Sequence, residues 1–236
     1  MNLKQKIEVS EQLGLFKSLD LIYKAVPSGT CDGCTRCCHE SVNLSNVEGL
    51  NIIATYFLNQ EGDVSVTKDR SDRLLRFFLR EWVDAMKCPF LEGEKCSIYQ
   101  ARPLPCRIFG NRTEEAYAEN FRRIQLQNQS VQRSLFKSEG LRLPRRVTAH
   151  KIGYCQSYVR TSTLDEEAVN ALYDRLIQLD SRLYFEGGIE DLSMNAHLVG
   201  FFVDEVILEQ SFEIVNRTLL DELKREMLKN INVAVK

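Results

Sequence analysis

Four cysteines within eight residues constrain this chain more than any other feature of its sequence. Cys31, Cys34, Cys37 and Cys38 form the pattern Cys-x2-Cys-x2-Cys-Cys. Two cysteines separated by two residues can turn both sulfurs toward one metal or one cluster. Gly33 permits the tight turn that this spacing requires. The sequence therefore predicts a loop that is organised around a bound metal.

The other cysteines are Cys88, Cys96, Cys106 and Cys155. The amino terminus lacks the apolar stretch of a secretory signal, so we expect a cytoplasmic protein. In a reducing compartment metal ligation explains eight cysteines better than disulfides do. All eight are therefore candidate ligands, although Cys155 is isolated in sequence and could equally be a buried free thiol.

We favour an iron–sulfur cluster of the 4Fe-4S type, with zinc as the alternative. The two-residue gaps match the first three thiols of a bacterial ferredoxin run, whose last cysteine precedes a proline, as Cys88 does here. Structural zinc sites usually pair two closely spaced cysteine pairs, and the longer gaps from Cys88 to Cys96 and Cys106 fit that pattern poorly. Eight thiols exceed the needs of one four-ligand centre, so either two centres exist or some thiols have another role.

Charged and imidazole side chains lie near the cysteines in sequence. Arg102 and Arg107 flank Cys106, and we expect them to donate hydrogen bonds to sulfur. His39 follows the cysteine run and is interpreted as a polar loop residue, since the thiols already suffice as ligands. His150 is isolated in the sequence.

Helical periodicity of apolar residues dominates outside the cysteine loops and predicts a mostly α fold. Capping boxes are expected at Ser45 with Glu48 and at Thr163 with Glu166. Residues 88–110 should form an ordered loop and a short hairpin that turns at Gly93, with little core of its own. The predicted helices lie within residues 15–26, 45–57, 75–86, 117–135, 163–183, 198–208 and 212–231.

Composition and charge limit the partners. The 236 residues carry a formal charge of -2 and are 44% hydrophobic, as in ordinary globular proteins, which disfavours a nucleic-acid or membrane partner. The basic connector around Arg142, Arg145 and Arg146 is interpreted as a solvated loop. We expect residues 1–160 to form a metal-binding domain, with its motifs in 31–110, and residues 161–236 to form a helical region packed on it.

Three spaced motifs resemble the YkgJ family of cysteine-cluster proteins. They are the run from Cys31 to Cys38, then Cys88-Pro-Phe-Leu, then Cys96-Ser-Ile-Tyr-x-x-Arg-Pro-x-x-Cys106-Arg-x-Phe. That family is described as a zinc- or iron-chelating domain and is related to the flagellin lysine N-methylases. The resemblance implies that the seven cysteines of these motifs form the metal site. Gly110 departs from the family, in which proline is usual at this position.

These observations predict an iron–sulfur protein that transfers electrons or supports an oxidoreductase, with an unidentified protein as its redox partner. Two alternatives remain open at this point. The resemblance suggests a metal-dependent protein lysine N-methyltransferase, although no glycine-rich cofactor fingerprint is present. A non-catalytic interaction module stapled by zinc would also explain the cysteines.

Overall fold

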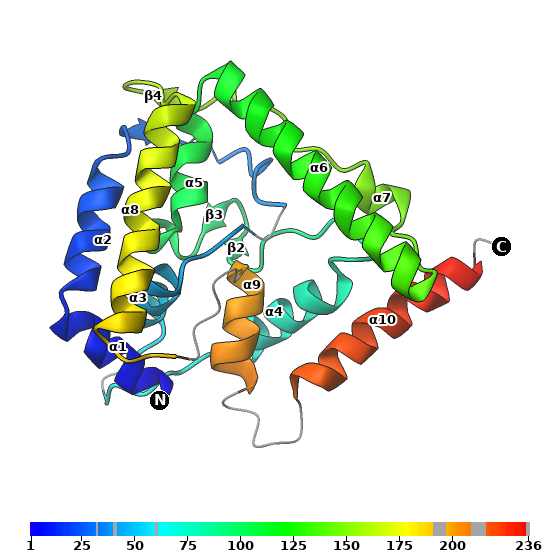
Figure 1. The fold of residues 1–236 in the computed structure, drawn as a ribbon, viewed down its shortest axis with the longest axis horizontal. Coiled ribbons are helices and arrows are strands. Elements are labelled where there is room, and N and C mark those ends of the chain that lie inside the picture. The colour runs from blue at the N-terminus through cyan, green and yellow to red at the C-terminus, as the bar shows by residue number, and fades with distance from the viewer. Residues whose placement is uncertain (32, 40–41, 60, 191–196, 209–215, 235–236) are drawn as a thin grey trace.

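The computed structural model describes residues 1–31, 33–39, 42–59, 61–190, 197–208 and 216–234. Within these ranges the fold is mostly α, as predicted, with two short antiparallel sheets (Figure 1). The first sheet pairs Gly29–Thr30 (β1) with Val159–Arg160 (β4), and the second pairs Leu91–Glu92 (β2) with Lys95–Cys96 (β3). The α-helices span Leu3–Gln12 (α1), Leu15–Lys24 (α2), Asn46–Tyr56 (α3), Lys68–Arg80 (α4), Leu104–Ile108 (α5), Glu114–Glu139 (α6), Arg145–Thr148 (α7), Glu166–Phe185 (α8), Leu198–Phe202 (α9) and Arg217–Ala234 (α10).

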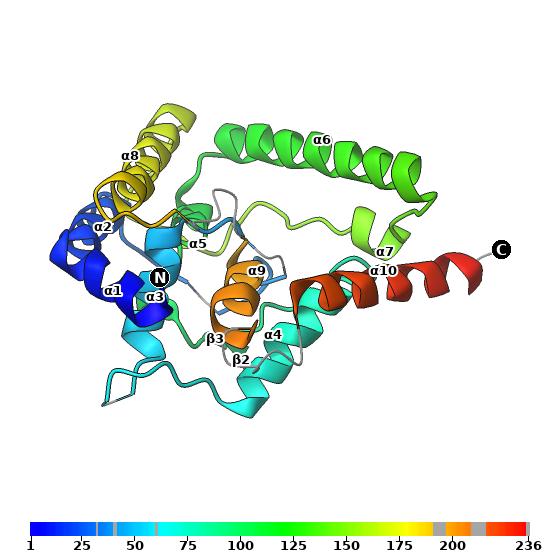
Figure 2. The ribbon, with the colours of Figure 1, turned by 60° about the horizontal axis from the view of Figure 1, so that its bottom comes forward.

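One large hydrophobic core unites the chain from Leu3 to Leu220. Helices α1, α2, α3 and α8 pack together, α9 packs on α3 and α4, and α10 lies along α4 (Figures 1 and 2). The core draws side chains from both sides of residue 160. The division at residue 160 therefore stays a prediction. No helix in the described ranges has the length and apolar character that crossing a bilayer requires.

Local sequence signals position α3 as expected. Ser45 Oγ accepts a hydrogen bond from the Glu48 backbone N–H at 3.2 Å, and Glu48 Oε2 accepts one from the Ser45 backbone N–H at 3.1 Å. This reciprocal capping box satisfies two donors at the start of the helix. It also fixes the Glu48 side chain at the helix N-terminus, where it meets two other elements.

Two expected helix boundaries are wrong. Helix α4 ends at Arg80 rather than near residue 86, and the chain continues as a turn in which the Val83 and Asp84 N–H groups both donate to the Arg80 carbonyl. The Val83 carbonyl accepts a hydrogen bond from the Arg146 guanidinium. Helix α8 is capped by Asp165, whose side chain accepts from the Ala168 N–H at 2.9 Å, and not by Thr163. Of the last predicted helix, residues 212–215 lie outside the described residues.

The cysteine-rich segment 88–110 contains the expected hairpin, with Gly93 in the turn at a φ of 63°. Several of its side chains enter the main core, so the segment is anchored there rather than by a core of its own. Phe90 is fully buried, with its ring centroid 5.0 Å from that of Phe202 and 6.3 Å from that of Phe57. The other anchors are Ile98, Ala101, Leu104 and Ile108.

Two glycines provide a matched test of this packing. Gly49 on α3 faces Phe201 so closely that an added Cβ would overlap the buried ring, whereas nothing lies within 4 Å of a Cβ at Gly200. Gly49→Ala should lower the free energy of unfolding by about 1–3 kcal/mol through overpacking, despite the better helix propensity of alanine. Gly200→Ala should be neutral or stabilise by up to about 1 kcal/mol. Urea denaturation of both variants measures this, and equal effects would contradict the packing.

Candidate metal centre

The first cysteine run forms a tight loop through two residues with left-handed backbone. Gly33 has a φ of 76°, as the turn predicts, and Thr35 has a φ of 57°, which is unusual for a β-branched residue. The Cys38 N–H donates to the Thr35 carbonyl, and the Cys38 carbonyl accepts from the Cys88 N–H, both at 2.9 Å. These bonds hold the first cysteine run against the start of the second cysteine segment.

Six thiols lie close enough to interact, and we call the five of them that are not exposed the inner thiols. Cys37 is hydrogen-bonded to Cys38, and Cys88 interacts electrostatically with Cys37 and Cys96. Cys106, on α5, interacts with Cys88, Cys96 and Cys37. Cys31 is exposed and interacts with Cys96. The inner thiols thus come from three places in the sequence: Cys37, Cys38, Cys88, Cys96 and Cys106.

Burial and mutual proximity raise the pKa of four of the inner thiols, Cys37, Cys88, Cys96 and Cys106. Burial raises the pKa of Cys88 to about 11 and raises that of Cys96 as well. The hydrogen bond with Cys38, followed by burial, raises the pKa of Cys37. Burial and then the neighbouring thiols raise the pKa of Cys106. A bound metal cation would reverse this balance because it stabilises thiolate directly, so metal binding must release protons.

The two arginine candidates differ in position. Arg102 lowers the pKa of Cys37, Cys96 and Cys106 electrostatically, so its charge lies near all three. Its Nε is buried without a hydrogen-bond partner among the described residues. Arg107 instead stacks on Tyr23, 3.7 Å from the ring centroid, and its Nε donates to the Arg102 carbonyl at 2.8 Å.

Two further candidate ligands, Cys34 and Cys155, lie near the same hydroxyl group. Ser157 Oγ lies 3.9 Å from the Cys34 sulfur and 3.9 Å from the Cys155 sulfur. The structure thus brings Cys155, isolated in sequence, beside the first cysteine run. His150 is likewise not isolated in space, because its ring centroid lies 5.8 Å from that of His39.

A buried carboxylate connects the elements that surround the inner thiols. Glu48 is fully buried, and its Oε1 accepts from the Tyr23 hydroxyl at 3.0 Å and from the Leu104 N–H, the first residue of α5, at 2.6 Å. Burial raises the pKa of Glu48 to about 7. Asp180 on α8 caps the same end of α3 by accepting from the Asn46 and Val47 N–H groups. Glu48 therefore positions the helix that carries Cys106.

The departure at Gly110 has a structural reason. The Tyr158 side chain packs directly on the backbone of Gly29 and Gly110, so a Cβ at either position would overlap the ring. The proline usual at position 110 in the family cannot fit beneath this ring. Tyr158 joins the loop that carries Cys155 to the segment after α5.

Comparison with known protein families gives a match for the cysteine-rich part of the chain. Residues 30–130 match the model of the CxxCxxCC family, described as "Putative zinc- or iron-chelating domain". We refer to residues 30–130 below as the CxxCxxCC domain, after the family model to which they are similar. The match is consistent with the resemblance to the YkgJ proteins and supports metal binding by the cysteine cluster. No curated protein and no solved structure matched the chain.

The residues present fit a thiolate-bound metal by their chemistry. Within the described residues, no three Cys, His, Asp or Glu side chains already converge as a set of ligands. The inner thiols nevertheless supply enough soft donors for zinc or an iron–sulfur cluster. The unpartnered Arg102 Nε is a donor suited to a sulfur that carries negative charge. Which cysteines of the CxxCxxCC domain are ligands stays a prediction.

Sequence reasoning missed three residues that shape this centre. Glu48 was interpreted only as part of a capping box, and nothing in the sequence links it to Tyr23 or Leu104. Ser157 and His150 carry no recognisable motif. Their roles depend on contacts between residues far apart in the chain, which periodicity and spacing do not report.

The raised pKa of Glu48 predicts a measurable pH dependence. Because the folded state binds this proton more tightly than the unfolded state, stability should fall as pH rises from about 4.5 to about 7, by on the order of 3 kcal/mol. Glu48→Gln should flatten this slope, leaving the smaller part due to Asp180, whose pKa is also raised by burial. Urea denaturation across this pH range measures the effect. Glu8→Gln, at an exposed position, is the control, and equal slopes in the two variants would contradict the assignment.

Proposed function

We propose that the protein is a cytoplasmic iron–sulfur protein in which the CxxCxxCC domain holds a 4Fe-4S cluster and exchanges electrons with a protein partner. The observation that carries this proposal is the grouping of the inner thiols, three of which lie near the charge of Arg102. A bound cluster would supply reversible one-electron chemistry. A centre of free thiols also suits a reducing compartment.

Anchoring of the cysteine segment favours a chemical role over a structural one. A zinc staple is needed where loops cannot bury a core of their own. Here Phe90, Leu104 and Ile108 are fully buried in the main core, so the segment is held without a metal. The thiols are therefore available for a centre whose purpose is reactivity.

Partial exposure of the cysteines supports electron exchange. Cys31 is exposed and the other seven are intermediate in exposure, so the centre lies near the surface. A partner could approach it without opening the core. Arg102 would hold the centre in its electrostatic field and tune its potential, because hydrogen bonds and nearby charge set iron–sulfur potentials.

Cysteine substitution tests the ligand set. After anaerobic reconstitution, Cys106→Ala and Cys88→Ala should lose most of the bound iron, because each removes an inner thiol. Cys155→Ala should retain the iron and the electron paramagnetic resonance signal that appears on dithionite reduction. Iron analysis and spectroscopy measure this. Full iron content in Cys106→Ala and Cys88→Ala, or a reconstituted protein that dithionite cannot reduce, would contradict the proposal.

Substitution of Arg102 provides a second test, because a residue with a purely structural role would not change the reduction potential of the centre. Arg102→Gln removes a positive charge beside three thiols, so it should make the reduction potential of the centre more negative. Lys95→Gln removes an equal charge at an exposed position and should change the potential less. Redox titration followed by visible absorption measures both, and equal shifts would count against the role of Arg102.

A further inference from the structure

Helix α6 is supported at its ends and open along its middle (Figures 1 and 2). Of its 26 residues only Ala116 and Leu135 are buried. Leu135 joins a small cluster with Val83, Leu141 and Leu228 at the carboxyl end of the helix. Between the ends, Leu126 is 48% exposed and Val131 55% exposed. A long helix held in this way leaves a side free for contact with another molecule.

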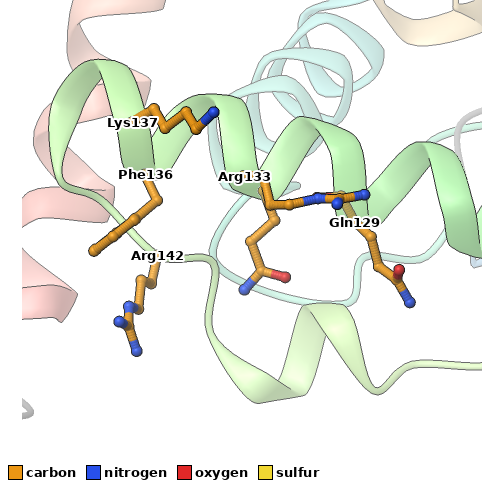
Figure 3. A pocket seen from close by; sticks show the side chains of 6 residues that line it. Gln129, Arg133, Phe136, Lys137 and Arg142 are labelled. Carbon is orange, nitrogen blue, oxygen red and sulfur yellow. The ribbon is translucent and has the colours of Figure 1, made fainter.

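A groove follows this helix toward the cysteine centre. Its outer part has a volume of about 440 Å³ and is lined by α6 residues from Gln129 to Lys137 and by Arg142 (Figure 3). Its inner part, of about 140 Å³, ends at Phe109 and His150. Gln129 and Gln132 line both parts, so the two parts adjoin, and we call them together the α6 groove.

The inner end of the α6 groove lies beside the centre. Phe109 follows Cys106 by three residues, and the His150 ring packs near His39, which is adjacent to Cys38. The buried Nε2 of His150 has no hydrogen-bond partner among the described residues. A molecule that fills the groove would therefore reach the residues that flank the inner thiols and could use this nitrogen.

Charge is confined to the outer end of the α6 groove. Arg133, Lys137 and Arg142 line it, and none of them forms a salt bridge within the part of the chain that the structure describes. Arg122 and Arg123, on the same helix, are paired with Glu119 and Glu166. Because the whole chain carries a charge of -2, these unpaired cations are a local feature that favours an acidic ligand.

The inner part is lined instead by neutral amides together with aromatic and apolar side chains such as Tyr117, Phe121 and Ile124. Asn120, Gln125 and Asn128 present groups that can donate to and accept from a peptide backbone. A nucleic acid carries a phosphate at every nucleotide and would need cations along the whole path. The distance along α6 from Tyr117 to Lys137 is about 30 Å, which an extended peptide of about nine residues would span.

We propose that the α6 groove binds an extended acidic segment of a partner protein and guides it to the cysteine centre. Acidic side chains meet Arg133, Lys137 and Arg142, and the backbone continues between the amides toward His150. Binding of the acidic segment does not require the metal. The inference that this segment belongs to a redox partner rests on the proposed function.

Fluorescence anisotropy tests this with a fluorescein-labelled peptide of alternating glutamate and serine, about nine residues long. The wild-type protein should bind it more tightly than a glutamine–serine peptide or an oligothymidylate of equal length. The variant Arg133→Glu, Lys137→Glu, Arg142→Glu should bind about tenfold or more weakly. The control variant Lys17→Glu, Lys24→Glu, Arg175→Glu makes the same change in charge on exposed cations of other elements and should bind like wild type.

A second pair of variants tests the path rather than the charge. Gln129→Trp places a large side chain where the two parts of the groove meet and should weaken binding, whereas Gln127→Trp, at an exposed position outside the lining, should not. Equal loss in both charge variants, no difference between the tryptophan variants, or tighter binding of the oligothymidylate would overturn the proposal. Iron content is measured in each protein, so a failure of peptide binding is distinguishable from a failure to hold the centre.

Discussion

The buried carboxylate of Glu48 is the interaction on which the arrangement of the centre depends. It closes the capping box of α3, accepts the Tyr23 hydroxyl from α2 and accepts the first N–H of α5. Burying an acid is costly unless its oxygens are hydrogen-bonded, and these three donors meet that requirement. Because α5 carries Cys106, a helix cap deep in the core fixes the position of a thiol at the centre.

The same logic extends to the rest of the cysteine segment. Phe90, two residues after Cys88, packs against Phe57 and Phe202, so the hydrophobic core holds this part of the chain. The thiols are therefore gathered by the fold, although burial raises their pKa values and disfavours thiolate. A metal cation would offset that electrostatic cost, and Arg102 already offsets part of it. In the CxxCxxCC domain the packed core holds the thiols in place. A bound cation would stabilise the thiolate forms that burial disfavours.

Local signals in the sequence predicted much of this fold, and long-range contacts account for what they missed. The apolar stripe of α2, the capping box of Ser45 with Glu48 and the turn at Gly93 each depend on neighbours a few residues away. The segment after α4 is held by Arg146, more than sixty residues later, whose guanidinium donates to the Val83 carbonyl. The site shows the same division, since spacing identified the cysteines but could not reveal the links from Glu48 to Leu104 or from Ser157 to Cys34.

The proposed iron–sulfur cluster is tested most directly by the content of iron, acid-labile sulfide and zinc per chain after anaerobic purification of the unmodified protein. We expect iron and sulfide in equal amounts, about four of each, with broad visible absorption. Zinc in stoichiometric amount, without sulfide or colour, would contradict the proposal and identify the CxxCxxCC domain here as a zinc site.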